Sequence, residues 1–156
     1  MLAPEEAPQP VHYDRVNYPS SLQCVAIARR HTARLVDVWG YPEASDDAAV
    51  LLSELAGNAV QHGRLRGRLF QVELTVTGAV TGAMTGAVTG PDTAPTLRIA
   101  VSDARGEILP RPRHATPEDE FGRGLLIIRT LATRWGVARR TVGKTVWCEL
   151  DLGGCG

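Results

Sequence analysis

The sequence predicts a two-layer α/β sandwich, with three helices on one face of a mixed, mostly antiparallel sheet. Two long amphipathic helical patterns stand in the first half of the chain. Segments of alternating apolar and polar residues follow them, interrupted by one more helical pattern. Helices grouped against such a sheet favour a sandwich over a doubly wound parallel fold. The 156 residues suffice for one domain with its own hydrophobic core.

The composition excludes several classes of protein. The 17 basic and 17 acidic side chains balance, which removes any bulk attraction to nucleic acid. The three cysteines, Cys24, Cys148 and Cys155, form no Cys-x-x-Cys pair, which argues against a zinc site and a disulfide framework. No segment approaches the roughly 18 apolar residues that a membrane span needs. We therefore expect a cytoplasmic protein without direct contacts to nucleic acid or membrane, in which Cys24 and Cys148 are small buried apolar residues.

The chain begins with a segment, residues 1–18, that we expect to be a flexible leader followed by a possible edge strand. Its first ten residues hold three prolines and two glutamates and lack the basic start and apolar run of a signal peptide. Loose alternation over 11–18 is compatible with a short edge strand. Residues 22–39 then carry apolar side chains at helical intervals, and Ser20 or Ser21 is placed to cap this first helix.

The second helix, about residues 46–62, holds the polar pair on which the functional prediction depends. Ser45 is its expected N-cap. Glu54 and Asn58 are four residues apart, so their side chains project from one face. A carboxylate can accept a proton, and an amide oxygen is a hard ligand that suits magnesium. Such pairs are also common on solvated helix faces, so spacing alone leaves both interpretations open.

Two alternating segments, 69–76 and 96–103, predict half-buried strands. Between them, residues 77–90 form a tandem repeat of Thr-Gly-Ala units, which we interpret as a low-complexity hairpin insertion spanning 77–95. Such a loop is inexpensive, because each doubling of its length costs only about 0.6 kcal/mol in closure entropy. A tip that becomes ordered on a partner is the alternative interpretation.

The last part of the chain predicts a third helix and a closing hairpin. The helix covers 125–135 and follows a polar, proline-containing loop. We expect its apolar stripe to lie in the core; the stripe consists of Leu126, Ile127, Leu131 and Trp135. Segments 136–138 and 145–150 would pair as the hairpin. We thus expect one domain over 19–152, followed by a Gly-rich tail at 153–156.

Three stretches of the sequence resemble the sequence boxes of the GHKL ATPases, the group that includes the histidine kinases and gyrase. The run from Glu54 to His62, Glu-Leu-x-x-Asn-Ala-x-x-His, resembles the N-box. Asp103 resembles the start of the second box, Asp-x-Gly-x-Gly, although Arg105 replaces its first glycine and Gly106 falls one position late. Residues 122–125, Gly-Arg-Gly-Leu, resemble the phosphate-binding Gly-x-Gly-Leu box.

The resemblance implies a GHKL-like (Bergerat) fold, ATP and Mg²⁺ as cofactors, and a role for each residue of the boxes. Glu54 would be the catalytic base, Asn58 would hold magnesium, and Asp103 would fix the adenine. The other residues that the resemblance assigns to nucleotide binding are Gly106, Gly122, Arg123, Gly124 and Leu125.

The chain is most similar to the anti-sigma factor serine-protein kinases of actinobacterial type. This similarity implies a serine/threonine-protein kinase that binds a sigma factor and phosphorylates an anti-anti-sigma (STAS-type) protein, and it allows a homodimer. The altered second box keeps an alternative open, in which the domain is a binding module that sequesters a partner protein with weak or no catalysis.

Overall fold

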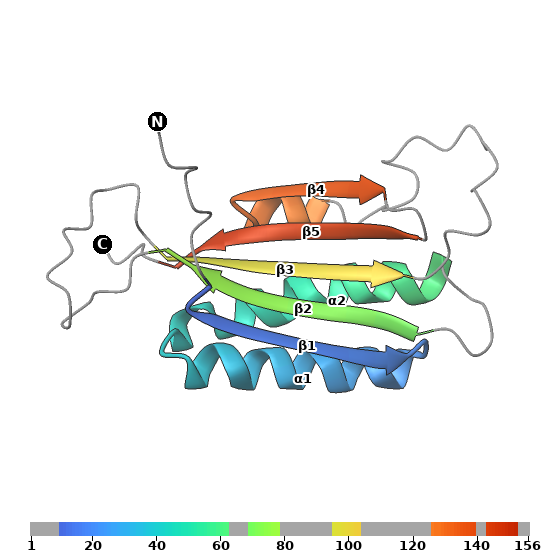
Figure 1. Ribbon diagram of the computed structural model, residues 1–156, viewed down its shortest axis with the longest axis horizontal. Helices are drawn as coiled ribbons and strands as arrows, with labels where there is room; N and C mark the ends of the chain where they lie inside the picture. Colours follow the sequence, from blue (N-terminus) through green and yellow to red (C-terminus); the bar gives the residue numbers. More distant parts are fainter. Residues whose placement is uncertain (1–9, 63–68, 79–94, 104–125, 140–142, 153–156) are drawn as a thin grey trace, which may run out of the picture.

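The computed structural model is a five-stranded antiparallel sheet with helices packed on one face (Figure 1). The structure describes residues 10–62, 69–78, 95–103, 126–139 and 143–152. The strands follow the spatial order β1-β2-β3-β5-β4, and every neighbouring pair is antiparallel. Their bounds are β1 (His12–Pro19), β2 (Leu69–Thr77), β3 (Thr96–Asp103), β4 (Arg134–Arg139) and β5 (Lys144–Asp151). The predicted sandwich is therefore confirmed, and the described strand pairs are all antiparallel.

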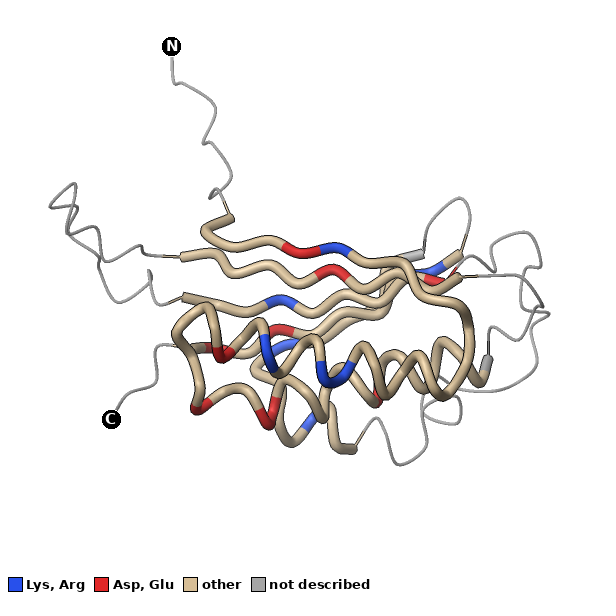
Figure 2. The backbone as a smooth tube through the Cα atoms, turned by 90° about the horizontal axis from the view of Figure 1, so that it is seen from below, with Lys and Arg blue, Asp and Glu red and all other residues tan. Residues whose placement is uncertain are grey.

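The helical layer is formed by α1 (Leu22–Val38) and α2 (Ser45–His62), joined by a short 3₁₀ turn, η1 (Pro42–Ala44), and by a further helical stretch over 126–131. Figure 2 shows the sheet and this layer edge-on. α1 starts as predicted, because the Ser21 hydroxyl accepts a hydrogen bond from the Cys24 amide at 3.2 Å. The core lies between the two layers.

The start of α2 differs from the prediction. Ser45 has helical backbone angles (φ −59°, ψ −46°) and is the first residue of the helix, so it is not an extended N-cap. The reason is that η1 leads directly into α2 and leaves no extended residue between them. The Ser45 hydroxyl instead donates to the carbonyl of Ala33 in α1 at 3.2 Å, which ties the two helices together.

The inner face of the sheet carries the alternation that the sequence predicts. Every second residue of β2 and β3 is buried against the helices, and β5 continues the pattern. These buried side chains are Phe70, Val72, Leu74, Val76, Leu97, Ile99, Val101, Val146 and Cys148. One buried face specifies the register strongly, because a slip of one residue would turn all of these side chains to solvent.

The predicted third helix is partly wrong. The chain is helical only to Leu131, and Trp135 belongs to β4, where it lies opposite Cys148. Ile128 is fully buried, whereas Leu126 is 66% exposed. The helix ends because the Thr133 amide donates to the carbonyl of Glu149 in β5, so that the sheet ladder replaces the helical hydrogen bonds.

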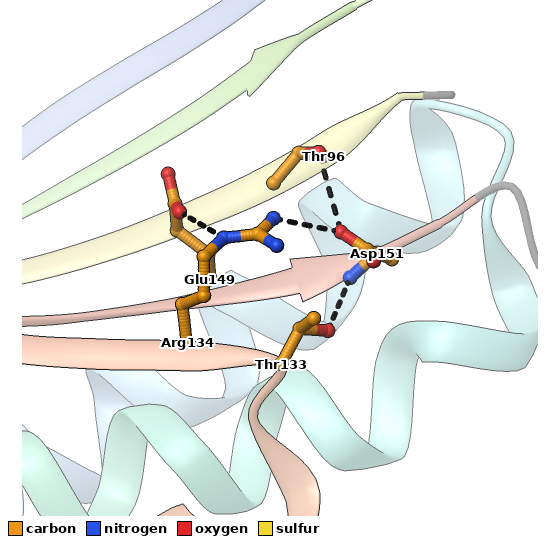
Figure 3. Close-up of polar contacts among 5 residues, drawn as sticks. All are labelled: Thr96, Thr133, Arg134, Glu149 and Asp151. Atoms are coloured by element: carbon orange, nitrogen blue, oxygen red, sulfur yellow. Dashed lines mark hydrogen bonds and ion pairs between the residues drawn. The ribbon is translucent and has the colours of Figure 1, made fainter. Parts of the chain in front are cut away.

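A polar cluster joins β3, β4 and β5 at the end of the sheet where β3 begins (Figure 3). Arg134 donates to Glu149 at 2.8 Å and to Asp151 at 2.9 Å. Asp151 also accepts a hydrogen bond from the Thr96 hydroxyl, and its amide donates to Thr133 at 3.1 Å. These contacts hold the two strands of the predicted β4–β5 hairpin together at the end away from its turn, and they join the hairpin to β3.

The predicted repeat insertion connects β2 and β3, which are adjacent antiparallel strands with Thr77 opposite Thr96. Residues 79–94 lie outside the described part of the chain, as do 1–9 of the predicted leader and the tail at 153–156. Of the cysteines, Cys148 is fully buried and Cys24 is half-buried, and both are free thiols. Cys155 also lies outside the described residues.

Candidate functional site

The described residues that the sequence predicts for nucleotide binding lie on two elements, α2 and β3, whose C-terminal ends are at the same end of the sandwich. Asp103, the last residue of β3, lies opposite Phe70 of β2 and Lys144 of β5. Figure 1 shows the C-terminal end of α2 and the start of α1 at this same end, and α2 packs on β3. The second half of α2, with Glu54 and Asn58, therefore lies at the same end of the sandwich as Asp103.

A pocket of about 270 Å³ opens on this half of α2, and we call it the α2 pocket. Its described lining residues are Leu22, Glu54, Gly57, Asn58, Val60 and Gln61. Glu54, Asn58 and Gln61 are spaced at three to seven residues along α2 and so share one face, on which Gln61 is exposed and the other two are half-buried. Leu22 is the first residue of α1 and contributes to the pocket from that helix. The carboxylate of Glu54 and the amide of Asn58 thus share one pocket.

The side-chain amide nitrogen of Asn58 is an unsatisfied buried hydrogen-bond donor among the described residues. No described residue accepts a hydrogen bond from it. An unpaired buried donor costs roughly 1–3 kcal/mol. The amide of Asn58 can therefore donate a hydrogen bond to a ligand that carries acceptor oxygens, such as a phosphate.

The side chains of the α2 pocket suit a magnesium ion that takes most of its ligands from water and phosphate. No group of three or more His, Cys, Asp and Glu side chains gathers at one place in the described part of the chain. An all-protein cage for the ion is therefore absent from these residues. Magnesium commonly keeps several waters and takes its remaining ligands from a few protein oxygens and from substrate phosphates. The Asn58 amide oxygen suits this role.

Asp103 is half-buried and lies on the inner face of β3, because it follows Leu97, Ile99 and Val101 at steps of two residues. On the opposite face, the hydroxyls of Ser102 and Thr145 lie 2.8 Å apart. This side-chain bond links β3 to β5 one residue before Asp103. The carboxylate is thus carried by a strand that is fixed on both sides.

Comparison with protein families matches residues 18–150 to the histidine kinase-like ATPase domain. The chain belongs to this family. A search of curated proteins finds no match. The coarse part of the prediction, an ATP-binding domain of GHKL type, is supported by the match.

Several predicted nucleotide-binding residues of this histidine kinase-like ATPase domain lie outside the described residues. They are Gly106, Gly122, Arg123, Gly124 and Leu125. Their assignment stays a prediction, as do the roles of Glu54, Asn58 and Asp103. Within the residues that the structure describes, no helix is long and apolar enough to cross a membrane.

Four residues of the α2 pocket were not predicted from the sequence: Leu22, Gly57, Val60 and Gln61. Gly57 and Gln61 follow Glu54 by three and seven residues, so the helical period could have placed them on the same face. Leu22 had no such signal. It reaches the pocket only because α1 packs along α2, which is a tertiary contact.

Proposed function

We propose that the chain is an ATP-dependent serine/threonine-protein kinase that acts as an anti-sigma factor. It would bind a sigma factor and phosphorylate an antagonist protein of the anti-anti-sigma (STAS-type) class. One observation carries the kinase part of the proposal: Glu54 and Asn58 line one pocket, and the buried Asn58 amide nitrogen has no hydrogen-bond partner among the described residues. The binding of a sigma factor and the phosphorylation of an antagonist are supported by the sequence resemblance of the N-box helix.

Each described residue has one task in this proposal. Asp103 binds the adenine amino group, and Asn58 holds the magnesium ion with its amide oxygen. Magnesium bound there supplies charge neutralisation on the phosphate oxygens. Phosphoryl transfer depends mainly on positioning and charge neutralisation, so a small set of groups suffices.

Glu54 accepts the proton that the acceptor hydroxyl loses. The hydroxyl oxygen forms a bond to the γ-phosphorus of ATP. The bond from that phosphorus to the β–γ bridging oxygen breaks, and ADP leaves with the electron pair. The products are ADP and a phosphoserine or phosphothreonine, with the proton on the Glu54 carboxylate.

A second function is favoured by one feature of the sequence. Arg105 stands where the second box of the GHKL group has its first glycine. A bulky side chain at a glycine position restricts the close approach of a ligand to the backbone. In this alternative the domain sequesters a partner protein with weak or no catalysis.

Calorimetric titration with Mg²⁺-ATP tests the nucleotide site. We expect the wild-type chain to bind, and the substitutions Asn58→Ala and Asp103→Ala to raise the Kd by about tenfold or more, a loss of at least about 1.4 kcal/mol. Asn17→Ala is the matched control, because Asn17 is exposed on β1 and outside the α2 pocket. Equal Kd values in all four proteins would remove the site assignment.

Transfer of label from radioactive ATP to an anti-anti-sigma protein separates the two functions. In Glu54→Gln, transfer should fall by about 10²-fold, the usual contribution of a general base, while Mg²⁺-ATP still binds. Glu43→Gln is the control, since Glu43 is an exposed carboxylate of η1. Binding of Mg²⁺-ATP with no transfer by the wild-type chain would favour the sequestering module.

A further inference from the structure

The α2 pocket runs across the exposed surface of α2. Asn58 and Val60 both line it, yet they are two residues apart and so lie about 200° apart around the helix axis. Glu54 and Gln61 fall at angles between them on the exposed side. The wall at Leu22 belongs to α1, which packs along α2. Around the helix axis, Glu54 therefore has Asn58 on one side and Gly57 and Val60 on the other.

Within the described part of the chain, neither the backbone conformation nor the packing requires glycine at position 57. A glycine inside a helix costs roughly 0.5–1 kcal/mol relative to alanine. The φ of Gly57 is not positive, so the backbone conformation does not require it. A Cβ atom at this position would meet no atom of the described residues within 4 Å, so their packing does not require it either. What remains is the pocket itself, in which a bare backbone lets a ligand approach α2 closely.

The α1 side of the pocket has the wrong chemistry for phosphate. Leu22 is 70% exposed and Val60 is 5% exposed, and neither side chain has a hydrogen-bond donor or a charge. Gln61 is exposed beside them, and its amide can both donate and accept hydrogen bonds. An apolar wall, a bare backbone and an amide are the features that suit an extended polypeptide.

We infer that the α1 side of the α2 pocket, formed by Leu22, Gly57 and Gln61, holds the polypeptide segment that carries the acceptor serine or threonine. An apolar side chain of that segment packs on Leu22, the main chain passes over Gly57, and Gln61 bonds to it. This arrangement sets the acceptor hydroxyl beside Glu54, with the nucleotide phosphates on the Asn58 side. The inference rests on the proposed kinase function.

The test uses the full chain, Mg²⁺-ATP and a synthetic library of serine and threonine peptides with either an apolar or an acidic residue next to the acceptor. We expect wild type to label peptides of the apolar set. Leu22→Ala and Gly57→Ala should lower this transfer by about tenfold or more, while the Kd for Mg²⁺-ATP changes by less than about threefold. Ile27→Ala is the matched control, since Ile27 is 48% exposed on α1 outside the pocket.

The outcomes separate the inference from the proposed function. A wild-type chain that binds no Mg²⁺-ATP overturns the kinase proposal and the inference with it. A chain that binds and hydrolyses Mg²⁺-ATP but labels no peptide, or labels both peptide sets equally, overturns the inference alone. The inference is also wrong if Leu22→Ala and Gly57→Ala transfer as well as Ile27→Ala, or if they lose nucleotide affinity in proportion to transfer.

Discussion

The side-chain hydroxyls of Ser102 and Thr145 lie 2.8 Å apart and join β3 to β5 on the face of the sheet away from the helices. Ser102 is 7% exposed, so this bond is made away from bulk water. It lies next to Asp103 and Lys144, which are the following register pair at the site end of the sheet. The bond therefore helps to fix the strand that presents the Asp103 carboxylate.

A double-mutant cycle with Ser102→Ala and Thr145→Val should give a coupling energy of about 0.5–1.5 kcal/mol, the usual net value of a side-chain hydrogen bond. Urea unfolding of the four proteins measures it. Thr75→Val is the control, because Thr75 is a half-buried threonine of β2 without this contact. Strictly additive effects of the two substitutions would contradict a stabilising role for the bond.

The strands could be predicted from the sequence because their rule is local. Phe70, Val72, Leu74 and Val76 alternate with polar residues, and a single buried face fixes their orientation without knowledge of the partner strand. A serine cap of α1, at Ser20 or Ser21, was predictable for the same reason, since the serine side chain bonds only three residues ahead; the structure selects Ser21.

The third helix could not be placed from the sequence because four consecutive apolar residues, 125–128, leave its phase undetermined. Any of them could face the core, and only packing selects Ile128 over Leu126. Leu22 of the α2 pocket was missed for a related reason. It is more than 30 residues from Glu54 in the chain, and no periodicity connects two separate helices.

Substitution of Gly136 by alanine should destabilise the protein by about 1–3 kcal/mol, the usual cost of overpacking. A Cβ atom at Gly136 would lie 2.7 Å from Cζ2 of Trp147, which is directly opposite on β5. The indole cannot move freely, because the Arg98 guanidinium stacks on it at 4.6 Å from the ring centroid. A fall in the thermal midpoint tests this, and an unchanged midpoint would show that the ring has room to shift.

Gly57→Ala is the opposite case and should stabilise the fold by about 0.5–1 kcal/mol, because alanine is the better helix former. No atom of the described residues lies within 4 Å of the new methyl group. The same methyl group would project toward the α2 pocket, which Gly57 lines. Urea unfolding measures the gain, with Gly136→Ala as the comparison. A destabilised Gly57→Ala variant would mean that the glycine serves the fold.

Asn58→Ala should leave the free energy of unfolding unchanged or raise it slightly, although it removes a polar side chain from the site. The reason is that the Asn58 amide nitrogen is buried without a described partner, so the folded state gains nothing from it. Thr32→Val is the matched control, since the Thr32 hydroxyl is also buried and unpaired among the described residues but lies outside the α2 pocket. Thr32→Val should likewise not destabilise, and it should bind Mg²⁺-ATP as wild type does. A loss of more than about 1 kcal/mol in Asn58→Ala would point to a structural role for the amide.

The stability of the folded chain should fall with rising pH above pH 9, through Cys148. Burial, and after it the charge of Glu149, raises the pKa of the Cys148 thiol from 9.0 to about 12, while Arg98 acts in the opposite direction. Below pH 9 the thiol is protonated in both the folded and the unfolded chain, so this contribution is fully present. Between pH 9 and about 12 only the unfolded chain ionises, and stability decreases by up to about 1.4 kcal/mol per pH unit.

Urea unfolding at pH 8, 9 and 10 measures this dependence of stability on pH. The substitution Cys148→Ala should remove the part of it that comes from ionisation of the Cys148 thiol. The same burial predicts that Cys148 of the folded chain does not react with a thiol reagent at pH 8, because the thiolate is the reacting form. Cys24, which is only half-buried, provides the internal comparison. Rapid labelling of Cys148 in the folded state, or an identical pH slope in Cys148→Ala, would show that the thiol is accessible to water.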